Sequence, residues 1–215
     1  MKLLPVSLGD RSYDIHIAPG RLDDTGKLCQ QVLPRATRLA VVTDDTVGGL
    51  YAHRLLQSLW ARGYTASVIS LPAGEQTKSL HNLGVLYDSF MEMGLTRTDA
   101  VVALGGGVVG DLAGFAAATI LRGVDFVQVP TTLLAQVDSS VGGKVAIDLP
   151  AGKNLAGAFW QPRLVVMDPE VLDTLEDKTF SDGMAEVIKY GCIWDRAFFD
   201  FLTAHPSRQE VMKEI

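Results

Sequence analysis

The sequence predicts an α/β fold: a Rossmann-like domain with a largely parallel sheet, followed by the first helices of an all-α carboxy-terminal domain. Three observations predict it. Strand-like and helix-like stretches alternate over most of the chain, a glycine-rich turn joins one strand to one helix, and strand signals stop near residue 171. Such alternation is typical of parallel sheets covered by helices. We therefore expect an α/β domain over residues 1–171 and the start of a helical domain over 172–215.

Short apolar runs mark the predicted strands. Arg38–Thr43 is rich in β-branched residues, which is typical of a parallel strand buried on both faces. The other predicted strands are Tyr13–Ile17, Thr65–Leu71, Ala100–Leu104, Phe126–Val129 and Leu164–Asp168.

Helices are predicted where apolar residues recur with helical spacing. One spans about Val47–Arg62 with Gly63 placed to end it, and another begins near Leu80 and is closed by Gly94. A helix of small residues follows the glycine turn and runs through Thr119. Three more are predicted later, over Phe180–Tyr190, Asp195–Ala204 and Arg208–Ile215. The last of these shows no capping or stop signal, so we expect the chain to end in mid-element.

Composition indicates a globular chain and excludes some functions. The chain has 215 residues, 47% of them hydrophobic and 20% charged, and a net charge of -6, which argues against non-specific binding of nucleic acid. Cys29 and Cys192 lie far apart, which favours two reduced thiols. The first residues do not form a signal peptide, and no apolar run is long enough to span a membrane. We expect a soluble, cytoplasmic protein.

The glycine turn is the clearest functional motif. In Ala103–Asp111, the residues Gly105, Gly107 and Gly110 satisfy G-x-G-x-x-G between a strand and a helix. Missing Cβ atoms let a pyrophosphate approach the backbone, and the helix amino terminus supplies free N–H groups. The alternative is a tight turn that only serves close helix packing.

The acidic residue of the common dinucleotide fingerprint is not at its usual place. Asp125 has nearly the right spacing, but it begins a strand and so lies at the wrong edge of the sheet. Asp44 and Glu75 follow predicted strands and are the candidates for ribose binding. The pattern indicates a dinucleotide site in which the ribose-binding carboxylates precede the glycine turn instead of following it.

Further polar residues follow the strand at Phe126–Val129. Thr131 and Thr132 suit ribose or phosphate contacts, or equally a helix cap. Asp138–Lys144 and Gly152–Asn154 each combine glycine with lysine, which favours an anion pocket, the alternative being a solvated hairpin.

Glu186 and Lys189 are three residues apart on one helix and share a face. They form either an exposed ion pair or part of a site. The four histidines are dispersed, and none has the spacing of metal ligands.

Taken together, these motifs closely resemble the 3-dehydroquinate synthase family, in collinear order from about Thr43 to Phe201. Ala73 and Thr77 are slight departures, since an aspartate and an aromatic residue are common at those places. The resemblance rests on Leu71–Ser79, Ala103–Gly114, Arg122-Gly123, Val129–Leu134, Gln136–Lys144, Gly152–Asn154, Ala158-Phe159, Gln161-Pro162 and Gly183–Gly191.

The resemblance implies a lyase that depends on NAD⁺ and on Zn²⁺ or Co²⁺, and that acts in the shikimate pathway of aromatic amino acid biosynthesis. Such an enzyme converts 3-deoxy-D-arabino-heptulosonate 7-phosphate to 3-dehydroquinate and releases phosphate. NAD⁺ oxidises a substrate hydroxyl, phosphate is eliminated, the ketone is reduced again and the ring closes. The cofactor is regenerated in each turnover and must be shielded from water.

The resemblance also assigns residues. Lys144, Asn154 and Arg122 would bind the substrate phosphate, with Arg122 able to reach a neighbouring subunit. Asp138 and Lys189 would face the sugar hydroxyls. Glu186 would be a metal ligand. The implied NAD contacts are Asp44, Glu75, Lys78, Gly105, Gly106, Gly107, Val108, Val109, Gly110, Asp111, Thr131, Thr132, Lys144, Lys153, Val171, Leu172 and Thr174.

The family's other metal ligands are two histidines of the helical domain, which we expect beyond residue 215. We therefore expect a truncated chain that is inactive alone, from a longer protein that forms a homodimer. A related sugar-phosphate cyclase that makes an inosose or valiolone ring is one alternative. A nucleotide-binding module without catalysis is another. Glycerol-dehydrogenase-type enzymes share the architecture, but the segments Asp138–Lys144 and Gly183–Gly191 fit them poorly.

Overall fold

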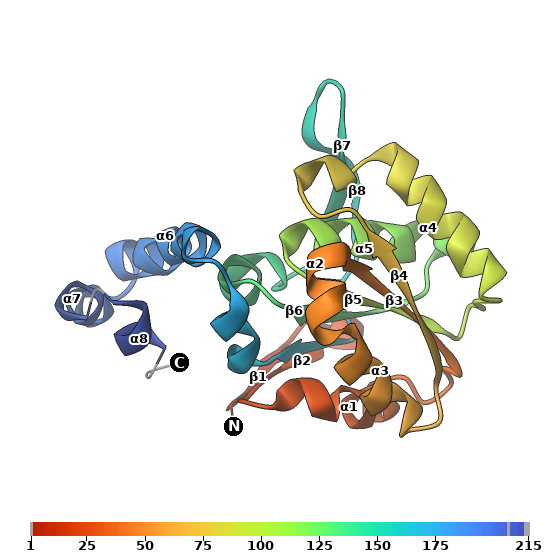
Figure 1. Cartoon of the computed structure of the whole chain (residues 1–215), viewed down its shortest axis with the longest axis horizontal. Coiled ribbons are helices and arrows are strands. Elements are labelled where there is room, and N and C mark those ends of the chain that lie inside the picture. Colours follow the sequence, from red (N-terminus) through yellow and green to blue (C-terminus); the bar gives the residue numbers. More distant parts are fainter. Residues whose placement is uncertain (1, 206, 213–215) are drawn as a thin grey trace.

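A computed structural model describes residues 2–205 and 207–212 of the chain. Its main sheet has seven strands in the order β1-β2-β9-β6-β5-β3-β4, and every neighbouring pair is parallel except β1 and β2 (Figure 1). These strands are β1 (Lys2–Val6), β2 (Tyr13–Ile17), β3 (Arg38–Asp44), β4 (Thr65–Leu71), β5 (Ala100–Gly105), β6 (Asp125–Pro130) and β9 (Leu164–Met167). A separate antiparallel hairpin is formed by β7 (Lys144–Leu149) and β8 (Gly152–Phe159).

Helices cover both faces of the main sheet. The α-helices are α1 (Thr25–Val32), α2 (Asp45–Val47), α3 (His53–Trp60), α4 (Leu80–Glu92), α5 (Gly107–Thr119), α6 (Asp177–Ile193), α7 (Arg196–Ala204) and α8 (Arg208–Val211). The shorter helical turns are η1 (Gly9–Arg11), η2 (Arg21–Asp24), η3 (Gly48–Ala52), η4 (Glu75–Thr77), η5 (Ile120–Arg122), η6 (Ala135–Ser139) and η7 (Pro169–Thr174).

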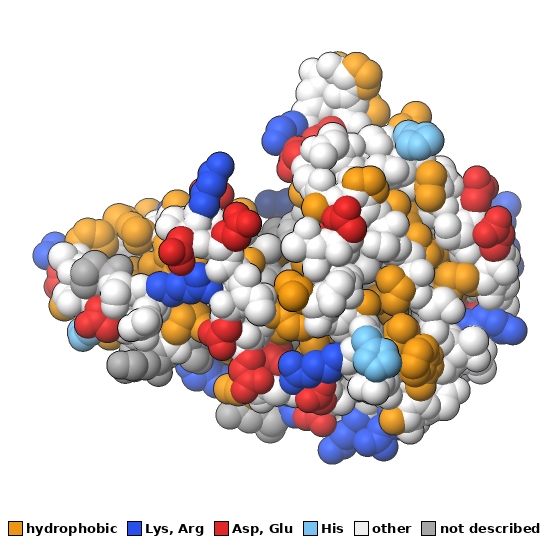
Figure 2. Space-filling view, in the orientation of Figure 1, with side chains coloured by type: hydrophobic (Ala, Val, Ile, Leu, Met, Phe, Trp, Pro, Cys, Tyr) orange, Lys and Arg blue, Asp and Glu red, His pale blue; other side chains and the backbone are white. Residues whose placement is uncertain are grey.

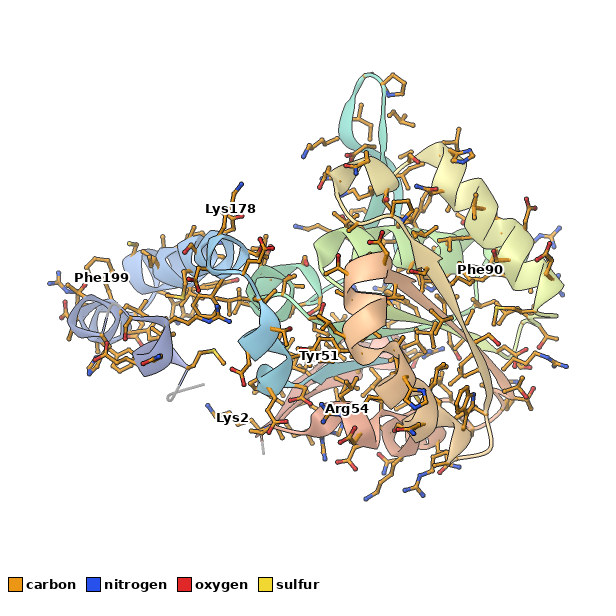
Figure 3. All side chains as sticks on the ribbon, in the orientation of Figure 1. Lys2, Tyr51, Arg54, Phe90, Lys178 and Phe199 are labelled. Atoms are coloured by element: carbon orange, nitrogen blue, oxygen red, sulfur yellow. The ribbon has the colours of Figure 1, made fainter. Side chains whose placement is uncertain are left out.

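Side-chain alternation along β3 explains the two layers. Leu39 and Val41 pack into a core with α1 and α3, whereas Ala40 and Val42 pack into a second core with α4 and α5. Successive residues of a strand point to opposite faces, so a strand that is apolar at every position is buried on both sides. Phe90 of α4 is fully buried in the second core (Figure 3).

The predicted fold class is confirmed, and so are the predicted strands and most of the helices. Gly63 and Gly94 follow α3 and α4 with φ of 83° and 67°. Such left-handed backbone favours glycine, which is why these residues end helices.

Some elements were not predicted or differ. The sequence analysis did not predict β1 or α1, and the predicted helix over Val47–Arg62 begins at Asp45 and passes through a π-helical segment. The expectation that the last helix lacks a cap is wrong. Ser207 and Glu210 form a capping box at the start of α8. Glu210 stands at the place in the sequence that such a box requires. The predicted end of this helix, residues 213–215, lies outside the described residues.

The helices α6, α7 and α8 lie to one side of the sheet (Figure 1). They share an apolar cluster that includes Leu133, Leu172, Phe180 and Leu202. At the far end of α6, Trp194 is 89% exposed, and apolar side chains are visible over this part of the surface (Figure 2). Among the described residues, none of the helices has the length and apolar character that crossing a membrane requires.

Candidate functional site

The site lies at the edge of the sheet where the parallel strands end. Gly105 ends β5, Gly106 is the N-cap of α5, and Gly107 begins this helix. The predicted strand–glycine–helix context is therefore present. Since α5 starts here, its free backbone N–H groups and the positive end of its dipole face this edge.

Close packing explains the glycines of the turn. A Cβ added at Gly106 would stand 3.0 Å from Thr132 Cγ2, and one added at Gly107 would stand 3.0 Å from Ser139 Oγ. Thr132 and Ser139 therefore lie next to the turn, and a side chain at Gly106 or Gly107 would fill the space that separates the turn from them. The same crowding is what the alternative of a tight packing turn requires, so the structure accommodates both interpretations.

The two threonines after β6 differ in their contacts. Thr132 Oγ1 accepts a hydrogen bond from Ala135 N at 3.2 Å, so Thr132 serves as a helix cap. Thr131 is buried, and its Oγ1 has no hydrogen-bond partner among the described residues. A buried hydroxyl without a partner is costly, so Thr131 is the one that is available to a ligand.

A buried lysine lies next to the turn. Lys78 Nζ lies 2.7 Å from Asp111 Oδ2 and 4.0 Å from Asp148 Oδ1, and the lysine is only 5% exposed. Burial raises the pKa of Asp111, and the hydrogen bond from Lys78 only partly opposes this shift. Beside this group, Lys153 forms an exposed ion pair of 3.0 Å with Glu75. The predicted NAD contacts from three segments thus meet here.

Other predicted NAD contacts lie near the end of β3. Asp44 Oδ1 accepts a hydrogen bond from Val47 N at 2.8 Å and so caps α2. Tyr51 joins this region to η7, because its hydroxyl lies 2.6 Å from Thr174 Oγ1 and 3.1 Å from Val171 O (Figure 3). Leu172 is fully buried and belongs to the apolar cluster of the helices.

A cavity of about 590 Å³ opens between α5, η6 and the hairpin. The hairpin protrudes at the top of Figure 1, and the surface beside it is hollowed in Figure 2. The polar residues that line the cavity are Asp111, Asp138, Ser139, Lys144 and Asn154. All five come from segments that the sequence analysis singled out, and the cavity brings carboxylates, a hydroxyl, an amide and a cation together.

The structure contains the hairpin, and Lys144 and Asn154 of this hairpin line the cavity. Lys144 begins β7, opposite Phe159 of β8, while Lys153 and Asn154 lie near the start of β8. Asn154 has a left-handed backbone with φ of 58°, which is uncommon for a residue other than glycine. The hairpin therefore carries both Lys144 and Asn154 to the cavity.

Glu186 and Lys189 form the expected ion pair on α6. The hydrogen bond from Lys189 to Glu186 raises the pKa of Lys189, and the charge of Asp138 adds a smaller effect in the same direction. Neither residue lines the cavity. Among the described residues, no three His, Cys, Asp or Glu side chains are grouped so that they could hold a metal ion. Glu186 therefore stands alone as an expected ligand, and the described residues do not complete a metal site.

Arg122 is not brought to the cavity. It lies after the carboxyl end of α5, at the opposite edge of the sheet from the glycine turn. Leu121 and Arg122 both have left-handed backbones, with φ of 52° and 69°. The ring of Trp160 packs against Gly123 in this turn, and its backbone N–H donates to Gly143 O at 2.7 Å. Trp160 thus connects the Arg122 turn to the residue before Lys144.

Asp148 is a site residue that the sequence analysis missed. It contacts Lys78 and also accepts a hydrogen bond from Asn154 N at 2.8 Å. The available signal was a carboxylate that ends the alternating run of β7, four residues after Lys144. Its proximity to Lys78, seventy positions earlier by number, follows only from the tertiary fold.

Comparison with solved structures defines the class of protein. The chain is similar to 2-epi-5-epi-valiolone synthase from Streptomyces hygroscopicus, solved with NAD⁺ and Zn²⁺ bound, with 27% identity and a TM-score of 0.82 over 96% of this chain and 57% of that one. It is also similar to 2-deoxy-scyllo-inosose synthase complexed with carbaglucose-6-phosphate, NAD⁺ and Co²⁺, with 27% identity and a TM-score of 0.80 over 87% of this chain and 50% of that one. The fold is that of these NAD⁺-binding synthases.

Sequence comparison identifies the family. The family model described as 3-dehydroquinate synthase N-terminal matches residues 68–182. A 3-dehydroquinate synthase from Clostridium beijerinckii is 50% identical over 215 residues, which are 100% of this chain and 61% of that protein. The chain belongs to the 3-dehydroquinate synthase family. It spans about 61% of the length of this relative.

Proposed function

We propose that this chain provides the NAD⁺-binding part and one wall of the substrate cavity of a 3-dehydroquinate synthase. The reaction is the conversion of 3-deoxy-D-arabino-heptulosonate 7-phosphate to 3-dehydroquinate with release of phosphate. The observation that carries the proposal is the cavity, in which Lys144 and Asn154 lie with the carboxylates of Asp111 and Asp138 beside the glycine turn. Membership of the family supports the particular reaction.

The residues present fit NAD⁺. The turn from Gly105 to Gly107 leaves a cradle that a Cβ would fill, and Thr131 offers a buried hydroxyl without a partner among the described residues. We propose that the pyrophosphate lies on this turn and the α5 amino terminus, with Asp44 and Glu75 at the ribose hydroxyls. NAD⁺, when bound, supplies the reversible oxidation of a substrate hydroxyl.

The substrate side carries charge of both signs. Lys144 is exposed at the cavity and can hold a phosphate as a point charge, while the amide of Asn154 can donate hydrogen bonds. Asp138 and Lys189 are proposed to face the sugar hydroxyls. Because Arg122 lies at the other edge of the sheet, we propose that it acts in the site of a neighbouring subunit of a homodimer.

We also propose that residues 1–171 form the NAD-binding domain and that residues 172–215 begin a helical domain for metal and substrate. Glu186 is the proposed metal ligand from this chain, for Zn²⁺ or Co²⁺. The solved relatives that hold these ions support the choice of metals. The described residues do not complete a metal site.

A second candidate function is a related cyclase that acts on a sugar phosphate without a carboxylate. The fold is shared with the valiolone and inosose synthases, so the fold alone does not separate the candidates. The 50% identity to a 3-dehydroquinate synthase over the whole chain favours the first.

Two measurements test the proposal. Titration calorimetry of this chain with NAD⁺ is expected to show binding with one site per chain. In a protein that contains this chain and has the full length of its relatives, phosphate release is expected from the heptulosonate phosphate and not from a sugar phosphate that lacks the carboxylate. Binding of NAD⁺ with turnover of only the latter substrate would favour the second candidate.

A further inference from the structure

We infer that Asp148 is a positioning residue that fixes the nucleotide-binding Lys78 relative to the substrate-binding Asn154. The inference rests on the proposed function, in which Lys78 contacts NAD⁺ and Asn154 contacts the substrate. Asp148 touches both residues, although they come from different parts of the fold.

Asp148 lies where the hairpin ladder is interrupted. The register between β7 and β8 shifts between Ile147, which pairs with Ala156, and Leu149, which pairs with Gly152. Asp148 instead forms an isolated bridge with Ser79. A bulge turns a residue out of its ladder and re-aims it, and here it directs Asp148 to the segment that precedes α4.

The backbone of Asp148 holds the main chain of Lys78. Asp148 N donates to Lys78 O at 2.9 Å, so the bulged residue keeps its N–H satisfied by leaving the hairpin. This hydrogen bond ties the loop Glu75–Lys78 to the hairpin. Lys153 of β8 forms an ion pair with Glu75, which is a second tie between the same two segments.

The carboxylate of Asp148 acts on side chain and backbone at once. Its Oδ1 lies 4.0 Å from Lys78 Nζ and accepts the N–H of Asn154 at 2.8 Å. Asn154 has φ of 58°, in the left-handed region that asparagine adopts more readily than most residues other than glycine. The hydrogen bond from its N–H to Asp148 holds the backbone at this position. One carboxylate therefore restrains both an NAD⁺ residue and a substrate residue.

The test uses variants of this chain in titration calorimetry with NAD⁺. Asp148→Ala removes the acceptor and the charge, so affinity for NAD⁺ is expected to fall about tenfold, the effect of losing roughly one hydrogen bond to a charged group. Asp148→Asn keeps an oxygen for the N–H of Asn154 but lacks the charge beside Lys78, so its affinity for NAD⁺ is expected to fall as in the alanine variant. Amide hydrogen exchange at Asn154 is expected to quicken in the alanine variant and to stay slow in the asparagine variant.

Asp125→Asn is the matched control, because Asp125 is a carboxylate that pairs with Arg163 at the other edge of the sheet. It is expected to leave NAD⁺ affinity unchanged. A folded Asp148→Ala variant with the affinity of the unchanged chain would overturn the inference, as would an equal loss in the control. Asp148→Leu, which also lacks an acceptor, replaces the alanine variant if that variant does not fold. If the unchanged chain does not bind NAD⁺, the proposed function fails, and hydrogen exchange at Asn154 still decides whether Asp148 positions it.

Discussion

At Gly107 a single added methyl group would stand 3.0 Å from Ser139 Oγ. The branched side chain of Gly107→Val needs more room than that and would occupy the space in which a pyrophosphate would approach the backbone. We predict that this variant loses NAD⁺ binding by at least about a hundredfold while remaining folded. Titration calorimetry measures the affinity, and circular dichroism checks the fold.

Gly84→Val is the matched control for this change. Gly84 is also a helical glycine, in α4, and an added Cβ there meets nothing within 4 Å. NAD⁺ affinity should be unchanged in this control. Retained affinity in folded Gly107→Val would mean that the pyrophosphate lies elsewhere.

Asp99 shows how one buried carboxylate orders the opposite edge of the sheet. Its Oδ1 accepts from Thr37 N and Arg38 N at 2.9 and 2.8 Å, and its Oδ2 accepts from Thr96 N at 2.8 Å. Asp99→Asn would set an NH₂ group against a backbone donor. We predict a loss of roughly 2 to 3 kcal/mol in the free energy of unfolding at neutral pH. Urea unfolding of both proteins measures it.

The loss should depend on pH. Burial alone would raise the pKa of Asp99, but the hydrogen bonds from Thr96, Thr37 and Arg38 outweigh it and leave the pKa below its usual value. A carboxyl group with a lowered pKa stabilises the fold above its unfolded pKa, and this contribution disappears as the pH falls through the folded pKa. The difference between the two proteins should therefore shrink below about pH 4. A constant difference from neutral to acid pH would show that the charge of Asp99 is not involved.

On the scale of elements, the hairpin of β7 and β8 brings Lys144 to the cavity. We predict that Lys144→Ala weakens binding of the phosphorylated substrate by roughly tenfold to a hundredfold, because a charge-assisted contact with phosphate is lost. Titration calorimetry with the heptulosonate phosphate measures the change, in a protein that contains this chain, has the full length of its relatives and is saturated with NAD⁺.

The control for the hairpin is Lys178→Ala. Lys178 is an exposed lysine of α6 that does not line the cavity (Figure 3). Its removal should leave the affinity as it is. An analogue that lacks the phosphate should bind equally well to the unchanged protein and to Lys144→Ala. If Lys144→Ala weakens binding of the analogue as much as binding of the natural substrate, Lys144 has another role.

Patterns within one element were predictable from the sequence, whereas contacts between elements were not. The alternation of β3 and the glycines of the turn are local, so the strand–turn–helix unit was predicted correctly. The strand β8 consists mostly of glycine, alanine and polar residues and is exposed over much of its length, so its pattern differs little from that of a solvated loop. The group of Lys78, Asp111 and Asp148 depends on three distant segments meeting, and nothing in their spacing indicates it.

For the whole molecule, the main consequence concerns the metal. Catalytic zinc normally has three protein ligands, and the described residues offer only Glu186 at the expected place. We predict that the 215-residue chain folds and binds NAD⁺ but neither retains zinc nor turns over substrate. Elemental analysis measures the zinc, and a phosphate-release assay with NAD⁺ and the heptulosonate phosphate measures the activity. A protein that contains this chain and has the full length of its relatives is the positive control. Stoichiometric zinc with steady phosphate release from the 215-residue chain would show that residues 1–215 suffice.

The placement of Trp160 makes it an optical reporter of the site. The other two tryptophans, Trp60 and Trp194, are 47% and 89% exposed, so their indole rings fluoresce largely in contact with water. Trp160 is partly buried, donates its indole N–H to Val124 O at 3.0 Å and is hydrogen-bonded to Gly143 at the mouth of the hairpin. Its emission should form the short-wavelength part of the spectrum. A shift of that part when phosphate or NAD⁺ is added would therefore follow the start of β7 without any attached label.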